Sequence, residues 1–507
     1  MSIFNRIRDF FRKGAVTIGL KTELQSVLDH PKIAGDKAEY LRIKDSLARY
    51  EGDYPAIEYR NSNGDTKRRK PGTINMIKKV ANKYATVVFN EQCEIHVGMD
   101  DEGQVVNMEL SEFINNVFEH NDFKKNFSKY LEPMFALGGL ACRPYYDPKQ
   151  NQIEFSWALP DAFYPLHSNT NNISECALTF RTTRTEGNRN IYYTLLEFHE
   201  WQDEKYVITN ELYRSENPNT VGTNVPLSDL YDDLEETTPF TGLNRPLFAY
   251  VKPSGFNNIS PYSNLGLGIC DNCKDTLDRI NRTFDQYDQE IIRGKRRIAV
   301  SEMLMNTRMD ESGNIKQFFD DDEDTFQIIP GANLDEYSIK DLTSEIRANE
   351  YISTINHHFK TLEMETGLSA GTFFFDGRST KTATEIVAEN TQTYQSRSMQ
   401  ITEVEKFIKE LVISVCELAY SLDMYRGEIP SYDDIGVDFQ DGAFQSTDEK
   451  ISYYQKLINL GYPTSKAFAE ILQLPEEKAV ELYQQGLRER GNLLSGMTSG
   501  DLPTESE

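Results

Sequence analysis

The side chains that most often carry out chemistry in proteins are few and scattered in this chain of 507 residues. Cys270 and Cys273 form its one CxxC pair. A structural zinc site usually needs a second pair at similar spacing, and the other four cysteines are isolated. Since positions i and i+3 share one face of a helix, two small buried side chains explain the pair better than a metal site. We expect no metal and no cofactor.

Other catalytic and nucleotide-binding signals are also weak. The segment GRSTKT, residues 377–382, lacks the first glycine and the Gly-Lys pair of a phosphate-binding loop. His357 and His358 are adjacent on a predicted helix, so they point about 100° apart and cannot easily share one metal ion. Carboxylate pairs carry little information in a chain with 80 Asp and Glu. The sequence therefore predicts a protein that is not an enzyme.

The charge balance limits the partners. The formal net charge is −26, whereas sequence-specific DNA-binding proteins usually carry a basic footprint. Tight DNA binding is therefore disfavoured. The charge is still compatible with a protein that lets DNA pass without binding it. Most non-specific affinity for DNA comes from Lys and Arg that neutralise phosphates, and an acidic surface offers little of it. We expect assembly in a cytoplasm for three reasons. The chain has few cysteines, it lacks an apolar run of the roughly 18 to 20 residues that span a membrane, and we find no secretory signal.

Basic clusters interrupt this acidic background. One lies in a polar loop and comprises Lys67, Arg68, Arg69 and Lys70; the other follows a predicted helix and comprises Arg293, Lys295, Arg296 and Arg297. A solvated loop explains the first, and the helix macrodipole explains one or two cations of the second. Contact with nucleic acid or with an acidic neighbouring subunit is the alternative for both. The amphipathic residues 3–11 favour docking onto the protein body or a neighbouring subunit over a membrane surface.

Hydrophobic periodicity predicts the elements that position these residues. Helices are expected at residues 37–50 and 110–137, a helix followed by a strand at 74–97, and strands at 141–250, with a hairpin around Gln202–Glu204. Residues 215–241 form a polar, acidic insert that we expect to be a surface loop.

Two predicted helices of matched length, residues 268–293 and 341–366, flank a small mixed module at 294–340. Within that module we expect a strand at RRIAV and a hairpin of NIKQFF with FQIIP. Each helix would span roughly 35–40 Å. Their lengths predict an antiparallel hairpin that carries the module at its tip. The predicted packing residues are Leu277, Ile280 and Phe284 on one helix and Ile346, Ile352 and Ile355 on the other.

This order of elements resembles the portal proteins of tailed bacteriophages, in particular the branch of long-tailed phages of Gram-positive hosts. The N-terminal helix and strand of that family are resembled by INMIKKVANKYATVVFNEQCEIHV. The segment that leads into its wing sheet is resembled by FALGGLACRPYYD. The entry to the family's stem is resembled by PLFAYVKPSGFNNISPYSNLGLGICDNCKDTLDRINRTFDQY. The long helix after its tunnel loop is resembled by KTATEIVAENTQTYQSRSMQITEVEKFIKEL. The 215–241 insert and the extreme C-terminus match nothing in the family.

The resemblance implies an α+β fold with an α/β wing, a two-helix stem, a small α/β clip and a helical crown. The implied division is wing 1–266, first stem helix 267–293, clip 294–340, second stem helix 341–366, tunnel loop 367–380, long wing helix 381–430 and crown 431–490. The composition of residues 491–507 predicts a disordered tail.

The function implied by the resemblance is that of a ring subunit, twelve per virion, that forms the DNA channel at one capsid vertex. Such rings serve in genome packaging and ejection. The implied partners are double-stranded DNA, terminase, the major capsid and scaffold proteins and a head-tail adaptor, without a membrane. The alternatives are another virion structural protein, such as a minor head protein, which leaves the paired helices unexplained, or a packaging enzyme, which the missing phosphate loop disfavours.

The loop at 367–380 is the candidate functional segment. Gly367, Gly371 and Gly377 allow backbone conformations closed to other residues, and Phe373, Phe374 and Phe375 form an apolar run that a free surface loop rarely exposes. In a ring these loops would meet at the axis, with Arg378 and Lys381 near passing phosphates. We expect the loop to be mobile and to set the narrowest point of the tunnel; a buried core turn is the alternative.

Overall fold

The structure is a computed structural model. It describes residues 23–60, 64–90, 93–99, 105–169, 172–294, 298–299, 306–309, 315–318, 340–341, 345–374, 383–439 and scattered residues between 454 and 485. The chain divides into one unit of Met1–Glu91 with Ile95–Val437 and a second of Gln92–Glu94 with Asp438–Glu507. The amphipathic segment 3–11, most of the module 294–340 and the tail 491–507 lie outside the described residues.

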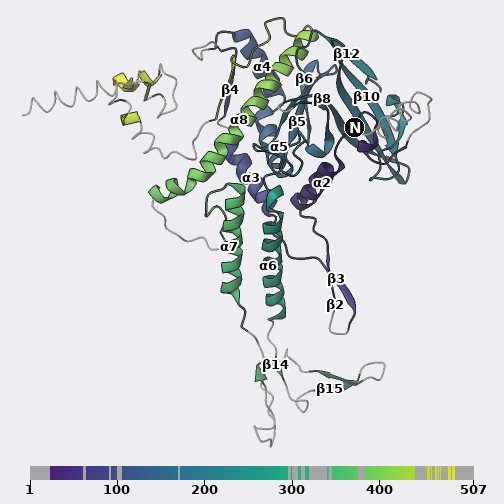
Figure 1. Ribbon diagram of the computed structural model, residues 1–507, viewed down its shortest axis with the longest axis vertical. Helices are drawn as coiled ribbons and strands as arrows, with labels where there is room; N and C mark the ends of the chain where they lie inside the picture. The colour runs from purple at the N-terminus through teal and green to yellow at the C-terminus, as the bar shows by residue number, and fades with distance from the viewer. Residues whose placement is uncertain are drawn as a thin grey trace, which may run out of the picture. The chain divides into compact units, whose positions relative to one another are not determined.

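The largest layer is a seven-stranded antiparallel sheet (Figure 1). Its strand order is β1 (Glu23–Leu24), β11 (Gly222–Val225), β10 (Lys205–Ser215), β9 (Arg189–Gln202), β8 (Ile173–Glu186) and β7 (Phe163–Ser168), and β12 (Thr237–Thr241) also pairs with β10. The predicted hairpin is confirmed: β9 and β10 are joined through Asp203, whose φ of 55° is typical of Asp in tight turns.

The 215–241 insert is not a plain surface loop, and that expectation was wrong. It contains β11, the short turn η3 (Leu227–Asp229) and β12, all within or beside the large sheet. Apolar residues spaced among its acidic ones, Leu227, Leu230, Tyr231 and Leu234, pack against the buried cluster around Leu195 and Leu212. The overall polarity of the segment masked this packing.

A second sheet, of three strands, lies against helices. It has the order β13 (Ala249–Val251), β5 (Leu140–Asp147) and β6 (Gln152–Ala158). α5 (Phe123–Leu137) and α8 (Ala383–Ser421) contact it. The Phe127 ring lies 5.3 Å from Phe407 of α8 and 5.9 Å from Trp157 of β6, centroid to centroid. This aromatic core fixes the long helix to the sheet, because fully buried rings contribute much of a core's stability.

Helices α2 (Lys37–Glu51), α3 (Met76–Val88) and the strand β4 (Glu94–Val97) form where the sequence predicts them. The single helix predicted at 110–137 is instead two, α4 (Met108–His120) and α5. Asp122 between them has a φ of 48°, and the Asn121 side chain donates to the carbonyls of Val117 and Ile153, at 2.9 and 2.8 Å. Hydrogen bonds of an Asn side chain to the backbone offer the chain an alternative to a continuous helix.

Two long helices, α6 (Lys274–Arg293) and α7 (Ala348–Thr366), lie side by side, as predicted (Figure 1). Both begin later than expected. The turn η4 (Asp271–Cys273) precedes α6, and β17 (Lys340–Asp341), paired with β14 (Ile298–Ala299), takes up the predicted start of the second helix.

The remaining small strands differ in part from the prediction. β16 (Ile315–Phe318) pairs with β15 (Asn306–Met309), whereas we expected its partner at 326–330, outside the described residues. β2 (Ile57–Arg60) and β3 (Thr66–Arg69) form a hairpin. β18 (Ile435–Asp438) is a strand that pairs with β4, within a region expected to be wholly helical. Among the helices that the structure describes, none has the length and apolar content to cross a membrane.

Candidate functional site

The hairpin of α6 and α7 has an apolar seam. Leu277 and Ile280 of α6 and Ile355 of α7 are each no more than 2% exposed. Tyr287 and Tyr351 pack further along the pair, with ring centroids 5.3 Å apart.

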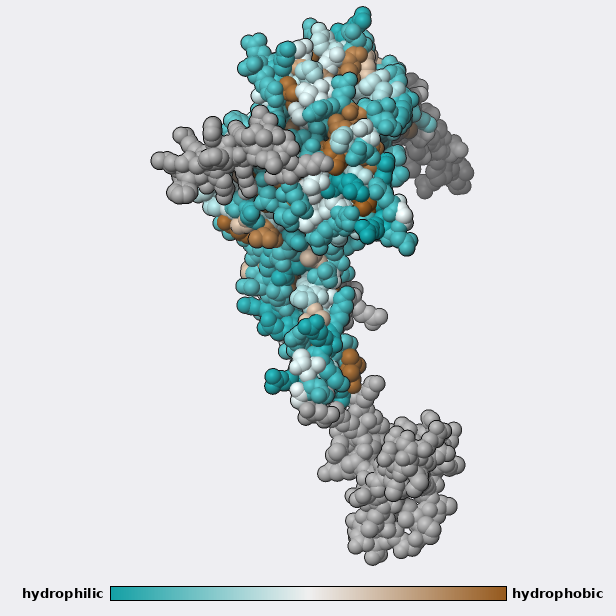
Figure 2. Space-filling view, turned by 90° about the vertical axis from the view of Figure 1, so that its right-hand side faces the viewer, coloured by the Kyte–Doolittle hydropathy of each residue, from teal (hydrophilic) through white to brown (hydrophobic). Residues whose placement is uncertain are grey.

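The other predicted packing residues are less deeply buried. Ile352 is half-buried, Ile346 is 38% exposed beside Gly294, and Phe284 is half-buried beside Gly72. The face of the hairpin that Figure 2 shows is mostly hydrophilic.

A buried ionic network holds the beginning of α6. Asp271 is 6% exposed, and its carboxylate accepts hydrogen bonds from the Arg42 guanidinium of α2, from the Ser46 hydroxyl at 2.6 Å and from the Gly268 N–H at 2.7 Å. Arg42 also donates to Glu39 at 3.1 Å. A charge this deeply buried is stable only when it is paired and hydrogen-bonded, so this network fixes where the hairpin leaves the body.

The CxxC pair lies in the same turn. Burial raises the pKa of the Cys273 thiol to about 12 and that of Cys270 well above its ordinary value. A protonated thiol is a poor nucleophile and a poor metal ligand. Within the described residues, no group of three or more His, Cys, Asp or Glu could hold a metal ion.

The first basic cluster contacts acidic residues of the same chain. Arg69 of β3 donates two hydrogen bonds to Asp285 of α6, at 2.5 and 2.6 Å. Arg68 pairs with Glu58 across the β2–β3 hairpin, at 2.5 Å, while Lys67 and Lys70 are exposed. This hairpin is therefore attached to α6 by a bidentate pair, which constrains orientation as well as distance. Of the second cluster, Arg293 is exposed at the end of α6, and Lys295, Arg296 and Arg297 lie outside the described residues.

The connection from α7 to α8 begins in a defined conformation. Gly367 ends α7 with a φ of 73°, and Gly371 has a φ of 89°. Phe373 is half-buried, 6.5 Å from the Phe359 ring, and Phe374 is 47% exposed. Phe375, Gly377, Arg378 and Lys381 lie outside the described residues.

Residues 367–371 read GLSAG and match the GxSxG pattern of hydrolase nucleophiles, a match that sequence reasoning missed. Such a serine sits on a strand-to-helix turn with its hydroxyl exposed. Ser369 instead follows a helix, is 3% exposed, and its hydroxyl lies 2.8 Å from that of Thr393. The geometry is that of a structural turn.

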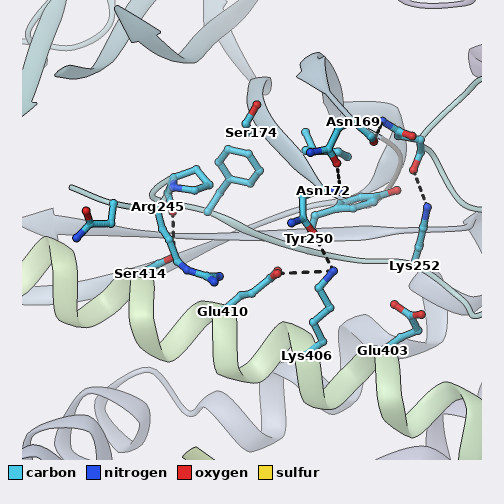
Figure 3. Close-up of a pocket in the computed structure, with 15 residues that line it drawn as sticks. Asn169, Asn172, Ser174, Arg245, Tyr250, Lys252, Glu403, Lys406, Glu410 and Ser414 are labelled. Atoms are coloured by element: carbon cyan, nitrogen blue, oxygen red, sulfur yellow. Dashed lines mark hydrogen bonds and ion pairs between the residues drawn. The ribbon is translucent and has the colours of Figure 1, made fainter. Parts of the chain in front are cut away.

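Sequence reasoning also missed a polar pocket of about 330 Å³ beside α8 (Figure 3). Lys406 of α8 donates to Asn172 at 2.9 Å and lies 3.9 Å from Glu410, and Lys252 donates to the Asn264 carbonyl at 3.1 Å. Burial raises the pKa of Glu410 and lowers that of Lys252. Both lysines already have oxygen partners in this chain.

Comparison with known families decides the class of protein. The family described as "Phage portal protein, SPP1 Gp6-like" matches residues 29–489. The chain belongs to this family of phage portal proteins. The portal family, the function as a portal protein and the α+β fold, all expected from the sequence, are thereby confirmed.

Portal proteins of this family are structural rather than enzymatic, and they assemble as oligomeric rings in virions. The finer branch within the tailed phages stays a prediction.

Two solved structures are also similar. One is titled "Neck of empty GTA particle computed with C6 symmetry"; it is 10% identical, covers 91% of this chain and 98% of its own, and has a TM-score of 0.41. The other, "Virion of native gene transfer agent (GTA) particle", is 10% identical, covers 94% and 99%, and has a TM-score of 0.42. No curated protein matches the chain. The assignment rests on the family match.

Proposed function

We propose that this portal protein forms a twelve-subunit ring at one capsid vertex and that double-stranded DNA passes through the ring without sequence recognition. The observation that carries this proposal is the α6–α7 hairpin, about 30 Å long by its residue count. It has an apolar seam and, on the face that Figure 2 shows, a mostly hydrophilic surface. In a ring, twelve such hairpins would surround a polar passage. The net charge of −26 per chain, with 54 Lys and Arg against 80 Asp and Glu, favours passage over adhesion, because Lys and Arg supply most non-specific affinity for phosphates.

We further propose the division of the chain that the resemblance implies. Residues 267–293 and 341–366 are the stem, 294–340 the clip, 1–266 and 381–430 the wing, and 431–490 the crown. The ring would assemble in the host cytoplasm and would dock the terminase, the capsid and scaffold proteins and a head-tail adaptor.

The connection between α7 and α8 is the proposed constriction. Twelve copies of the phenylalanine run would meet near the axis, with Arg378 and Lys381 close to the DNA. Replacing Phe374 and Phe375 with Gly should leave rings intact and reduce packaging in an in vitro packaging reaction. Normal packaging by that variant would exclude a role for this loop in the channel.

The basic cluster after α6 has two candidate partners, DNA and a neighbouring subunit, and we favour the subunit. In the double variant Arg296→Ala/Arg297→Ala, weakened rings would indicate a subunit contact, and intact rings with poor packaging would indicate DNA. Unchanged rings and unchanged packaging would exclude both.

A further inference from the structure

Glu363 is a carboxylate in an unexpected place. It lies on the buried face of α7, between Phe359 and Thr366, and is 1% exposed. An isolated buried carboxylate is costly unless hydrogen bonds satisfy it. Here the donors are main-chain: the N–H of Gly371 donates to Oε2 at 2.9 Å, and the N–H of Phe373 donates to Oε1 at 2.6 Å. Both carboxylate oxygens of Glu363 thus accept hydrogen bonds from the segment that follows α7.

The opposite side of that segment is attached to α8. The Ser369 N–H donates to the Thr393 hydroxyl at 2.8 Å, and the Thr393 N–H donates to the Ser369 hydroxyl at 3.1 Å. The Ser396 hydroxyl donates to the Gly367 carbonyl at 2.7 Å. Residues 367–373 therefore have two separate attachments, one to each helix. The Ser369–Thr393 bonds are buried, and the bonds to Glu363 are partly buried. The expected mobility of the loop 367–380 stays a prediction.

We propose that Glu363 is the positioning residue that fixes residues 371–373 to the end of α7, so that this segment and the helix move as one body. A carboxylate suits this role because it offers two acceptor oxygens and no donor. A glutamine would present an NH₂ group to one of the two N–H donors. Burial raises the pKa of Glu363, and the main-chain N–H groups oppose that rise by stabilising the charged form. The consequence for DNA passage rests on the proposed function of the α7–α8 connection.

The test compares amide hydrogen exchange, by mass spectrometry of peptides covering residues 367–374, in assembled wild-type, Glu363→Gln and Glu363→Ala protein. Loss of both acceptors in Glu363→Ala should speed exchange at residues 371–373 roughly ten-fold or more, since a hydrogen bond to a charged group is worth about 1.5–3 kcal/mol. Glu363→Gln should have a smaller effect. Glu350→Gln, which removes an exposed carboxylate from the same helix, is the control and should change nothing. Unchanged exchange in Glu363→Ala would overturn the proposal.

A second variant keeps the test decisive if Glu363→Ala does not fold. Thr393→Val removes the hydroxyl that accepts from the Ser369 N–H, and it leaves Glu363 and the Ser396 bond to Gly367 in place. We expect faster exchange at Ser369 with residues 371–373 still protected. Loss of protection at 371–373 in this variant would show that α8, rather than Glu363, holds them.

Packaging by the same proteins separates the two proposals. Faster exchange with reduced packaging supports both. Faster exchange with normal packaging keeps Glu363 as the positioning residue and overturns the role of the connection in the channel. Unchanged exchange overturns the positioning role and leaves the channel proposal to the phenylalanine variants.

Discussion

Arg347 at the start of α7 donates three hydrogen bonds to the carboxylate of Glu290 in α6. Its N–H and Nε reach Oε1 at 3.0 and 3.2 Å, and Nη2 reaches Oε2 at 2.6 Å. The same guanidinium carbon lies 5.6 Å from the Tyr351 ring centroid. The Glu290 carboxylate therefore accepts from both the main chain and the side chain of the residue that precedes α7, and this joins the two helices. With the Asp271 network at the other end, each end of the hairpin is fixed by a carboxylate.

This pairing predicts a dependence of stability on pH. The Arg347 side chain, followed by its N–H, lowers the pKa of Glu290 from 4.5 to about 2. A carboxylate with a depressed pKa adds stability above its unfolded pKa, and that stability is lost as the pH falls through the folded value. Thermal unfolding should therefore show Glu290→Gln to be less stable than wild type near pH 7. The difference should shrink as the pH falls from about 4.5 towards 2. A difference that does not vary with pH would contradict this account.

The apolar seam of the hairpin predicts a large effect of a buried charge. Ile355→Asp places a carboxylate at a position 1% exposed, without a cation opposite it in the seam described above. We expect a loss of several kcal/mol in the free energy of unfolding, on the order of 3 or more, and a loss of assembled protein. Ser353→Asp introduces the same charge on the exposed face of the same helix and should cost less than about 0.5 kcal/mol. Equal effects of the two variants, measured by chemical denaturation, would refute the seam.

The buried network at the start of α6 gives a second matched pair. Asp271→Ala leaves the Arg42 guanidinium buried with only Glu39 as its anionic partner. Removing one partner of a buried ion pair costs about 3–5 kcal/mol, so we expect a loss of that size in denaturation. Asp275→Ala, at an exposed site in the first turn of α6, should cost about 1 kcal/mol or less, mainly through the helix dipole. If Asp271→Ala is no worse than Asp275→Ala, the network does not hold the hairpin.

Much of the fold is readable from the sequence because its signals are local. The periodicity of Leu277, Ile280 and Ile355 predicts two amphipathic helices, and the absence of Pro and Gly from residues 381–422 predicts the longest one. Alternation in β9 and β10 predicts their hairpin. The order of these elements, rather than any single motif, indicates the portal family.

What the sequence could not reveal depends on contacts between distant residues. Asn121 ends α4 by bonding to a strand more than thirty positions away, and the insert after residue 215 pairs with β10 through a few apolar positions in an acidic stretch. Glu363 is one of 80 acidic residues, and nothing in its sequence neighbourhood predicts that it accepts two N–H groups from the next turn of chain. A buried carboxylate is recognised only once its donors are placed in space.

The most direct test of the account is the mass of the assembled protein. Native mass spectrometry of the purified full-length chain, over a range of salt and protein concentrations, should show closed rings of twelve or thirteen subunits, since head-to-tail contacts with rotational closure produce rings. Wild-type protein that remains monomeric under all of these conditions would contradict the proposal that this chain builds the channel through which the genome passes.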